Sequence, residues 1–308
     1  MRIFLTGASG YLGGVVTEHL IAAGHRVTAL ARSGAAQERV TELGAEPLPG
    51  SLADTETLRQ AAEDADAVVH TAVDFTHPAM HEVEQPALAA MLSGLKPGSP
   101  FVYTSTGLVY PDGAGAAIDE DTPVAPETSA QPYKVLGESQ VLAAEGPAVT
   151  VVRAALIYGR GGTALLQGMI AGARERKVTA YIGDGTHEWS SVHVDDLARL
   201  YLAALTRAEQ RLVVNAASRS RSSMREIAEA VAAISDAQSL SITIEQAQQS
   251  MGPLAGVLIR SSLLDPTRAE QLLGWKPAEP SLLDELRTGS YAAAATPARP
   301  FRFRSRPS

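Results

Sequence analysis

The chain has 308 residues, a formal net charge of −8 and no cysteine. The lack of thiols excludes disulfides, thiolate metal sites and a thiol nucleophile, and the negative charge argues against nucleic acid as the main partner. The length suits two domains or one large α/β unit. We expect a cytoplasmic protein, because no signal-peptide pattern precedes the first apolar segment and no apolar run approaches the roughly 20 residues of a membrane helix.

The first thirteen residues, MRIFLTGASGYLG, predict a strand over residues 1–6, a glycine turn and a helix over residues 11–23. Gly7, Gly10 and Gly13 stand at this junction. The first glycine permits a tight turn, the second lets a pyrophosphate approach the backbone, and the third lets helix and strand pack closely. The N–H groups at the helix start favour an anion. The junction predicts a dinucleotide site, the alternative being a glycine-rich turn without a ligand.

Strand and helix patterns alternate through the rest of the first half. The strands are predicted at residues 26–31, 46–48, 67–71 and 100–104, and the helices at residues 37–43, 55–63 and 78–92. Strands separated by helices imply right-handed crossovers. The fold class predicted is therefore α/β, a doubly wound parallel sheet of the Rossmann type.

The second half keeps part of this rhythm. We expect residues 1–160 to form mainly the nucleotide-binding domain, and residues 161–297 mainly a smaller lobe that caps the carboxyl ends of the strands, with some strands returning to the sheet. Residues 298–308 form a basic tail, which is either a loosely ordered solubilising end or a contact for an anionic partner. The elements predicted are strands at 149–153, 212–215 and 241–244, and helices at 131–144, 164–176, 194–206, 224–234, 266–273 and 282–295.

The end of the second predicted strand indicates which nicotinamide cofactor is bound. An acid there binds the 2′-hydroxyl of the adenosine ribose, whereas an arginine pairs with a 2′-phosphate. This chain has Arg32 and Ser33 there, with no acid until Glu38. Arginine suits phosphate because its planar fork donates two hydrogen bonds at once. The sequence thus favours NADP over NAD, the alternative being that Arg32 is a solvated charge.

Six motifs spread over residues 1–277 resemble those of one family. They are TGASGYLG, VVHTAV, VYTSTGLVY, VRAALIYGRGG, SVHVDDLARLYLAAL and DPTRAEQLLGWKP. Together they resemble the short-chain dehydrogenase/reductase superfamily in its extended or atypical branch, the epimerase/dehydratase-like proteins. The resemblance implies a Rossmann fold, hydride transfer at a nicotinamide and a possible homodimer. The cofactor-binding residues implied by the motifs and strand ends are Gly7, Ser9, Gly10, Tyr11, Leu12, Gly13, Arg32, Ser33, Ser51, Leu52, Thr71, Ala72, Val73, Thr104, Lys134 and Leu156.

In this family a Tyr acts as general acid/base, a Lys lowers its pKa and holds the ribose, and a Ser or Thr binds the carbonyl oxygen. Thr106 occupies the hydroxyl position, although it could instead be a turn residue that satisfies local backbone. The family spacing is Tyr-x-x-x-Lys on one helix, which puts both side chains on one face. We align Lys134 with the family's Lys because Glu138 follows it four residues on, and this leaves Ala130 at the Tyr position.

Three interpretations of this departure remain open. Tyr133 acts as a repositioned acid, another residue such as Tyr110 or His193 serves, or the usual reduction is lost. Both tyrosines could also be packing residues with a satisfied hydroxyl. The catalytic residues predicted are Thr106, Tyr133 and Lys134.

The sequence disfavours a nucleotide-sugar substrate. Leu156 stands where sugar-nucleotide members carry Asn, and Trp189 stands where they carry a phosphate-binding Arg. Losing an amide and a cation removes phosphate recognition and adds apolar surface, although Trp189 could equally be a core residue. We therefore expect an NADP-dependent oxidoreductase acting on a small, fairly apolar carbonyl or imine compound. The substrate-binding residues predicted are Asp74, Phe75, Leu108, Tyr110, Tyr133 and Trp189.

Two alternative functions and two rival sites complete the predictions. The chain could be an epimerase, dehydratase or lyase with retained cofactor, or a non-catalytic NADP-sensing protein. His77 and His81 have an i, i+4 spacing, but the H-E-x-x-H order of a zinc site is absent, so no metal is expected. No G-x-S-x-G elbow occurs, which argues against a Ser-His-Asp hydrolase, and His193 with Asp195 is assigned to the start of a helix.

Overall fold

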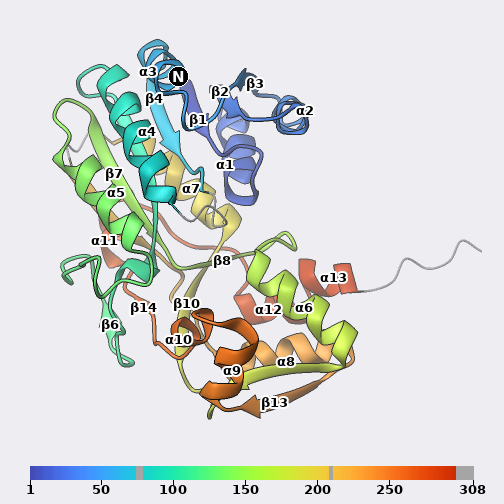
Figure 1. Cartoon of the computed structure of the whole chain (residues 1–308). Coiled ribbons are helices and arrows are strands. Elements are labelled where there is room, and N and C mark those ends of the chain that lie inside the picture. Colours follow the sequence, from blue (N-terminus) through green and yellow to red (C-terminus); the bar gives the residue numbers. More distant parts are fainter. Residues whose placement is uncertain (74–78, 208–210, 296–308) are drawn as a thin grey trace, which may run out of the picture.

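The computed structural model describes residues 1–73, 79–207 and 211–295. The predicted substrate residues Asp74 and Phe75, as well as His77 and the arginine-rich tail, lie outside the described residues. No helix within the described ranges is long and apolar enough to cross a membrane. Figure 1 shows two parts, a helix-covered sheet that contains the N-terminus and a smaller lobe below it.

The first part is built on a seven-stranded parallel sheet, which confirms the predicted fold class. Its strand order is β11-β7-β5-β4-β1-β2-β3, so the chain winds outward from β1 in both directions. In the central part of the sheet the strands are buried on both faces. Successive residues of β1 and β7 point to opposite faces, and almost all of them are buried. The strand bounds are β1 Arg2–Thr6, β2 Arg26–Ala31, β3 Glu46–Pro49, β4 Ala67–His70, β5 Pro100–Thr106, β7 Ala148–Ala154 and β11 Arg211–Ala216.

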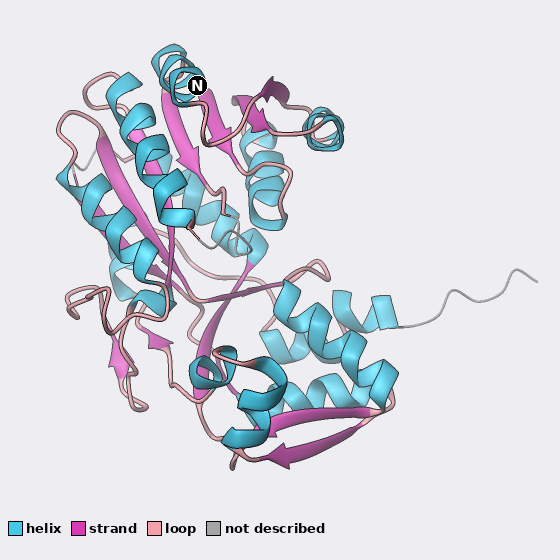
Figure 2. Cartoon of the chain, in the orientation of Figure 1, coloured by secondary structure: helices cyan, strands magenta, loops and turns pink. Residues whose placement is uncertain are grey.

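Helices cover both faces of this sheet (Figure 2). One apolar cluster contains Ile3 and Leu5 of β1 with residues of α1, α2, α7 and α11, and a second contains Phe4 with residues of α3, α4 and α5. Ile3 and Leu5 therefore point to one face of the sheet, and Phe4, which lies between them in the strand, points to the other face. The helix bounds are α1 Tyr11–Ala22, α2 Gly34–Glu42, α3 Thr55–Asp64, α4 Met80–Gly94, α5 Pro132–Ala143, α7 Val194–Leu205 and α11 Thr267–Leu273.

The chain enters the lobe at the carboxyl end of β7, where β8 follows directly. Trp189 and Tyr158 help to form the lobe's own apolar cluster. Two small sheets run through this part, with strand orders β12-β10-β8 and β13-β9, and a β14-β6 pair lies nearer the large sheet. The bounds are β6 Ala117–Ile118, β8 Leu156–Tyr158, β9 Val178–Ile182, β10 Glu188–His193, β12 Arg221–Ser223, β13 Gln238–Ile242, β14 Leu263–Leu264, α6 Ala164–Arg176, α8 Met224–Ser235, α9 Ile244–Met251, α10 Leu254–Leu258, α12 Leu282–Arg287 and α13 Ser290–Ala295.

Several predicted elements of the second half are corrected by the structure. The glycine-rich segment before α7 contains strands β9 and β10, and the helices α9 and α10 follow β13, where none was expected. The predicted helix over 282–295 is interrupted, because the Glu285 side chain accepts hydrogen bonds from the backbone and hydroxyl of Ser290. α7, β11 and α11 return to the large sheet after residue 160, and a domain boundary at that position stays a prediction.

Candidate functional site

The glycine loop joins β1 to α1 through a turn that only glycine fits. Gly7 has a φ of +91°, and its carbonyl accepts a hydrogen bond of 3.0 Å from the N–H of Gly10. A Cβ atom on Gly13 would lie 2.1 Å from the Gly7 carbonyl oxygen, and one on Gly7 would lie 2.7 Å from the Ala72 nitrogen. The loop therefore holds α1 close to the ends of β1 and β4, with the helix N-terminus open toward an anion. Side chains here would fill a cradle of the kind a pyrophosphate needs.

The other predicted cofactor residues follow strand ends on the same edge of the sheet. Leu30 of β2 pairs with Thr6, and Arg32 comes two residues later. Ser33 caps α2 by accepting a hydrogen bond of 3.2 Å from the Ala36 N–H. Ser51 and Leu52 follow β3 in the same way, and the Ser51 backbone and hydroxyl both donate to Asp54. These positions follow the carboxyl ends of β2 and β3, neighbours of β1 in the sheet, which is the edge where a dinucleotide binds in such folds.

The segment after β4 lies against the glycine loop. The Thr71 hydroxyl donates to the Thr6 carbonyl oxygen at 2.8 Å, and the Thr71 N–H donates to the same oxygen at 3.0 Å. Ala72 and Val73 follow, with the Val73 side chain exposed. Thr71 thus fixes the path of the backbone that the family motif assigns to the cofactor.

Thr104 and Thr106 come at the carboxyl end of β5. The Thr104 hydroxyl is hydrogen-bonded to the hydroxyl of Tyr201 on α7. Thr106 accepts a hydrogen bond of 3.2 Å from the Leu108 N–H and so caps the short 3-10 helix Gly107–Val109. This is the local role that the sequence left open. Because a hydroxyl has two acceptor lone pairs and one donor, Thr106 can still donate to a carbonyl oxygen.

The register of α5 follows from a buried ion pair. Glu138 accepts hydrogen bonds from the Arg153 guanidinium of β7, the shortest at 2.7 Å, and from the Ser105 hydroxyl of β5. Lys134, one turn earlier, lies on the same sheet-facing side, because residues i and i+4 share a helix face. Pro132 starts the helix, so Ala130 lies before it. The Ala130 N–H donates to the Leu108 carbonyl oxygen. Lys134 and Glu138 therefore share one face of α5, while Ala130 lies before the helix, and its alignment with the family's Tyr stays a prediction.

Lys134 is buried and paired. Its Nζ donates to Glu84 Oε1 of α4 at 2.6 Å and lies 4.7 Å from the centre of the Tyr103 ring and 5.3 Å from that of Tyr133. Burial lowers the pKa of Lys134, and the Glu84 carboxylate opposes this shift. Burial raises the pKa of Tyr133, and the charge of Glu84 raises it further. A lysine ammonium lowers the pKa of a neighbouring tyrosine, so Glu84 offsets the effect that the family pattern implies.

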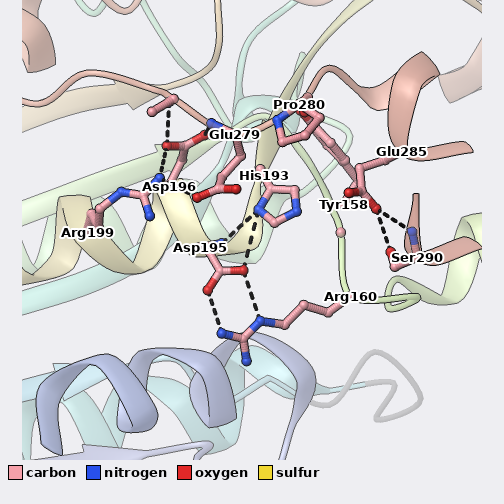
Figure 3. A network of polar contacts seen from close by, with 12 residues as sticks. Tyr158, Arg160, His193, Asp195, Asp196, Arg199, Glu279, Pro280, Glu285 and Ser290 are labelled. Carbon is pink, nitrogen blue, oxygen red and sulfur yellow. Dashed lines mark hydrogen bonds and ion pairs between the residues drawn. The ribbon is translucent and has the colours of Figure 1, made fainter. Parts of the chain in front are cut away.

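Tyr110 and His193, the alternative acids, are both engaged elsewhere. The Tyr110 hydroxyl donates to Asn215 Oδ1 at 2.9 Å and accepts from Arg153 at 2.7 Å, and burial raises its pKa to about 12. His193 Nδ1 accepts the Asp195 N–H at the start of α7, and Tyr158 packs edge-on against the ring (Figure 3). Tyr110 is 3% exposed and packs in the core of the sheet domain, so its place in the substrate site stays a prediction.

Trp189 belongs to the core of the lobe. Its indole N–H donates to the Arg260 carbonyl oxygen at 2.7 Å, and the residue is 6% exposed. Trp189 thus has the packing role that the sequence left open, and its contact with a substrate stays a prediction. Leu108 packs at the margin of the same cluster and is partly buried.

A polar network ties α1 to the lobe, and Figure 3 shows the part of it that joins Arg160 to Asp195. Arg160, which follows β8, donates to the Asp195 carboxylate at 2.9 Å and also contacts Glu18 of α1. His19 of α1 bonds the same carboxylate at 2.8 Å, and the Tyr11 hydroxyl donates to the Gly159 carbonyl oxygen at 2.7 Å. Since α1 begins at the glycine loop, this network fixes the lobe relative to the predicted cofactor site.

A narrow apolar pocket in the lobe was not predicted. Leu156 lines it, together with three of the chain's six methionines, Met169, Met224 and Met251. Methionine is flexible and polarizable, which suits a surface that adapts to an apolar ligand. Ala154 pairs with Thr106, and Leu156 comes two residues later. The pocket residues belong to β8, α6, β9, α8, β13, α9 and α10, with His187 just before β10, so no continuous motif could reveal it.

Comparisons with known proteins agree with this architecture. The family model described as the NAD dependent epimerase/dehydratase family matches residues 3–217. An uncharacterized protein of Saccharomyces cerevisiae is 29% identical over 303 residues, covering 93% of this chain and 98% of that protein. The 4-hydroxy-2-methyl-3-oxo-4-farnesyl-3,4-dihydroquinoline-1-oxide ketoreductase of Stigmatella aurantiaca is 32% identical over 218 residues, covering 67% and 65%. The structure of a UDP-glucose 4-epimerase of Thermotoga maritima superposes with a TM-score of 0.77 at 21% identity, covering 96% and 99%. The resemblance expected from the motifs is thereby confirmed.

Proposed function

Because the chain belongs to the NAD-dependent epimerase/dehydratase family, we propose that it is an NADP-dependent reductase of a small, fairly apolar carbonyl or imine compound. The observation that carries the cofactor assignment is the glycine loop, where a Cβ on Gly13 would lie 2.1 Å from the Gly7 carbonyl oxygen. The loop and the N-terminus of α1 would hold the pyrophosphate, and Arg32 would pair with the 2′-phosphate. When bound, the nicotinamide supplies the hydride.

The protein's own groups then act on the carbonyl oxygen. As this oxygen gains negative charge it needs hydrogen-bond donors and a proton. We assign Thr106 to bind the oxygen and Tyr133 to supply the proton, with the Lys134 ammonium beside the Tyr133 ring. Lys134 in this position would also hold the nicotinamide ribose, as the family motif implies.

The apolar pocket supports the substrate class. Its lining includes Leu156, two residues after the Ala154 that pairs with Thr106, and consists mainly of aliphatic and methionine side chains. The Stigmatella relative carries a farnesyl group in the name of its substrate, which is consistent with an apolar compound. We further propose a cytoplasmic homodimer, for which light scattering on the purified protein is the direct measurement.

The experiment is binding followed by turnover. We expect NADPH to raise the melting temperature of the purified protein more than NADH does. NADPH should be consumed with a panel of alkyl and aryl ketones, β-keto esters and cyclic imines. Tyr133→Phe and Thr106→Val should lower kcat while sparing NADPH affinity, whereas Thr41→Val, a surface change on α2, should alter neither. Failure to bind either cofactor would refute the assignment.

One observation favours a second candidate function. The family's Tyr position is Ala130, and the Lys134 ammonium is already paired with Glu84. A chain that binds NADP but has lost reduction would show this pattern, so a non-catalytic NADP-sensing protein is the alternative. Tight NADPH binding without consumption across the panel would support it. An epimerase or lyase would instead change the substrate with no net use of NADPH.

A further inference from the structure

A line of buried polar groups connects the glycine loop to α5. Thr6, the residue before Gly7, is hydrogen-bonded through its hydroxyl to His70 Nδ1 at 2.8 Å. His70 Nε2 lies 3.4 Å from Glu84 Oε1, and the same oxygen accepts from Lys134 Nζ at 2.6 Å. A His70 ring with its hydrogen on Nε2 satisfies both contacts, since it then accepts from Thr6 and donates to Glu84.

These groups are withdrawn from water. The side chains of His70 and Glu84 are 0% and 1% exposed, and that of Lys134 is 7% exposed. Burying an ion pair costs free energy that apolar residues of similar volume would not cost. The Lys134–Glu84 pair is buried at the edge of the sheet that holds the candidate site. Because apolar side chains would fill this position at a lower cost in free energy, the ion pair points to a role beyond packing.

The groups that face Lys134 come from four elements of the described chain. Glu84 belongs to α4, which packs beside α5 (Figure 1), and Tyr103 to β5. Tyr133 and Glu138 share α5 with Lys134, and His70 of β4 reaches it through Glu84. Glu138 is bound by the Arg153 guanidinium and contacts Ser105, so its charge is already compensated. Glu84 is therefore the carboxylate that balances the Lys134 ammonium.

We propose that Glu84 is a positioning residue, which keeps Lys134 in its charged form at the ends of β4 and β5, and that His70 holds the Glu84 carboxylate in place. The proposal rests on the function proposed above, because the ammonium group is what would serve the ribose and Tyr133. Without the carboxylate, burial drives the proton from Lys134. Burial alone would raise the pKa of Glu84, but His70 and Lys134 keep it below its ordinary value, so the carboxylate stays charged.

Nuclear magnetic resonance of labelled lysine tests this directly. The chain contains four lysines, and Lys96, Lys177 and Lys276 are exposed, so the buried Lys134 gives a distinct signal that Lys134→Met removes. Glu84→Gln keeps the shape and the acceptor oxygen but removes the charge. We expect the Lys134 midpoint to fall by roughly 1–3 pH units, the range for loss of a close opposite charge. Glu82→Gln, on the exposed side of the same helix, should leave it unchanged.

Activity provides the second readout. The alkaline limb of the kcat/KM profile in Glu84→Gln should move to lower pH, to the value at which Lys134 titrates, while folding by circular dichroism stays intact. If Glu84→Gln does not fold, Glu84→Asp replaces it, because its shorter side chain moves the carboxylate away and should lower the midpoint. A midpoint equal to that of the native protein overturns the proposal. A native protein that never consumes NADPH refutes the reductase assignment instead, and the lysine titration still decides the role of Glu84.

Discussion

Replacing Arg153 with leucine should destabilise the fold strongly, because it leaves the Glu138 carboxylate buried without its cation. The two side chains are 5% and 2% exposed. The Arg153 Nε donates to both oxygens of Glu138 at 3.1 Å, and Nη2 donates to Oε2 at 2.7 Å. Nη1 also donates to the Tyr110 hydroxyl at 2.7 Å, so the change removes four buried hydrogen bonds between β7 and its neighbours.

The magnitude follows from the cost of an unpaired buried charge. Breaking a buried ion pair by removing one partner costs about 3–5 kcal/mol. Domains unfold with about 5–15 kcal/mol in total, so Arg153→Leu should lose a large share of the stability. Glu138→Leu with Arg153→Leu removes both charges, and we expect the double variant to lose less than the sum of the single losses.

Urea unfolding followed by circular dichroism measures these differences. The matched control is Arg2→Leu, which breaks the exposed Arg2–Asp66 pair and should change stability little. A loss for Arg153→Leu no larger than that for Arg2→Leu would contradict the argument. Additive losses in the double variant would show that the two side chains do not interact.

Three further outcomes are expected from changes at separate sites. Gly13→Ala should cost about 1–3 kcal/mol, read from urea unfolding, and weaken NADPH binding, because the new Cβ meets the Gly7 carbonyl oxygen. Arg32→Ala should lower NADPH affinity roughly tenfold and spare NADH affinity by calorimetry, and an equal loss for both would remove Arg32 from phosphate recognition. Hydrogen bonds from the side chain and the backbone N–H of Arg2 lower the pKa of Asp66 to about 2. The Asp66 carboxylate therefore stabilises the folded protein above the ordinary pKa of an aspartate, and this contribution disappears as the pH falls toward 2. Asp66→Asn should therefore be slightly less stable than the native protein at neutral pH and equal to it below pH 2, as measured by urea unfolding across this range.

The sheet could be predicted because each of its strands carries its own signal. Ile3, Phe4 and Leu5 form a continuous apolar run, and such a run implies burial on both faces between helices. The helices between the strands supply crossovers, so order and direction follow from local patterns. The glycine loop is equally local, since all three glycines act within one turn.

The lobe offers no such signal. β10 has the sequence EWSSVH, in which Ser190 and Ser191 are buried although their side chains are polar. Ser190 satisfies its hydroxyl by accepting the Leu264 N–H, a partner 74 residues away in the sequence. A short strand with two buried serines, one of them paired at long range, has neither an apolar run nor an alternating pattern, so the sequence predicts a loop there. The sequence leaves Trp189 of the same strand open between a substrate contact and a core position, and the structure shows its indole N–H bonded to the Arg260 carbonyl oxygen.

In the candidate catalytic centre, the orientation of the helix residues could be predicted from the sequence, but their partners on other elements could not. Helix periodicity indicates correctly that Lys134 and Glu138 share one face, because this depends on a single element. It does not indicate what that face meets. The family motif pairs its lysine with a tyrosine four residues earlier, a position held here by Ala130, whereas the folded protein pairs Lys134 with Glu84, 50 residues earlier on α4. Since the charge of Lys134 depends on that partner, the chemistry of this site is set by the packing of α4 against α5 as much as by the motif that predicted it.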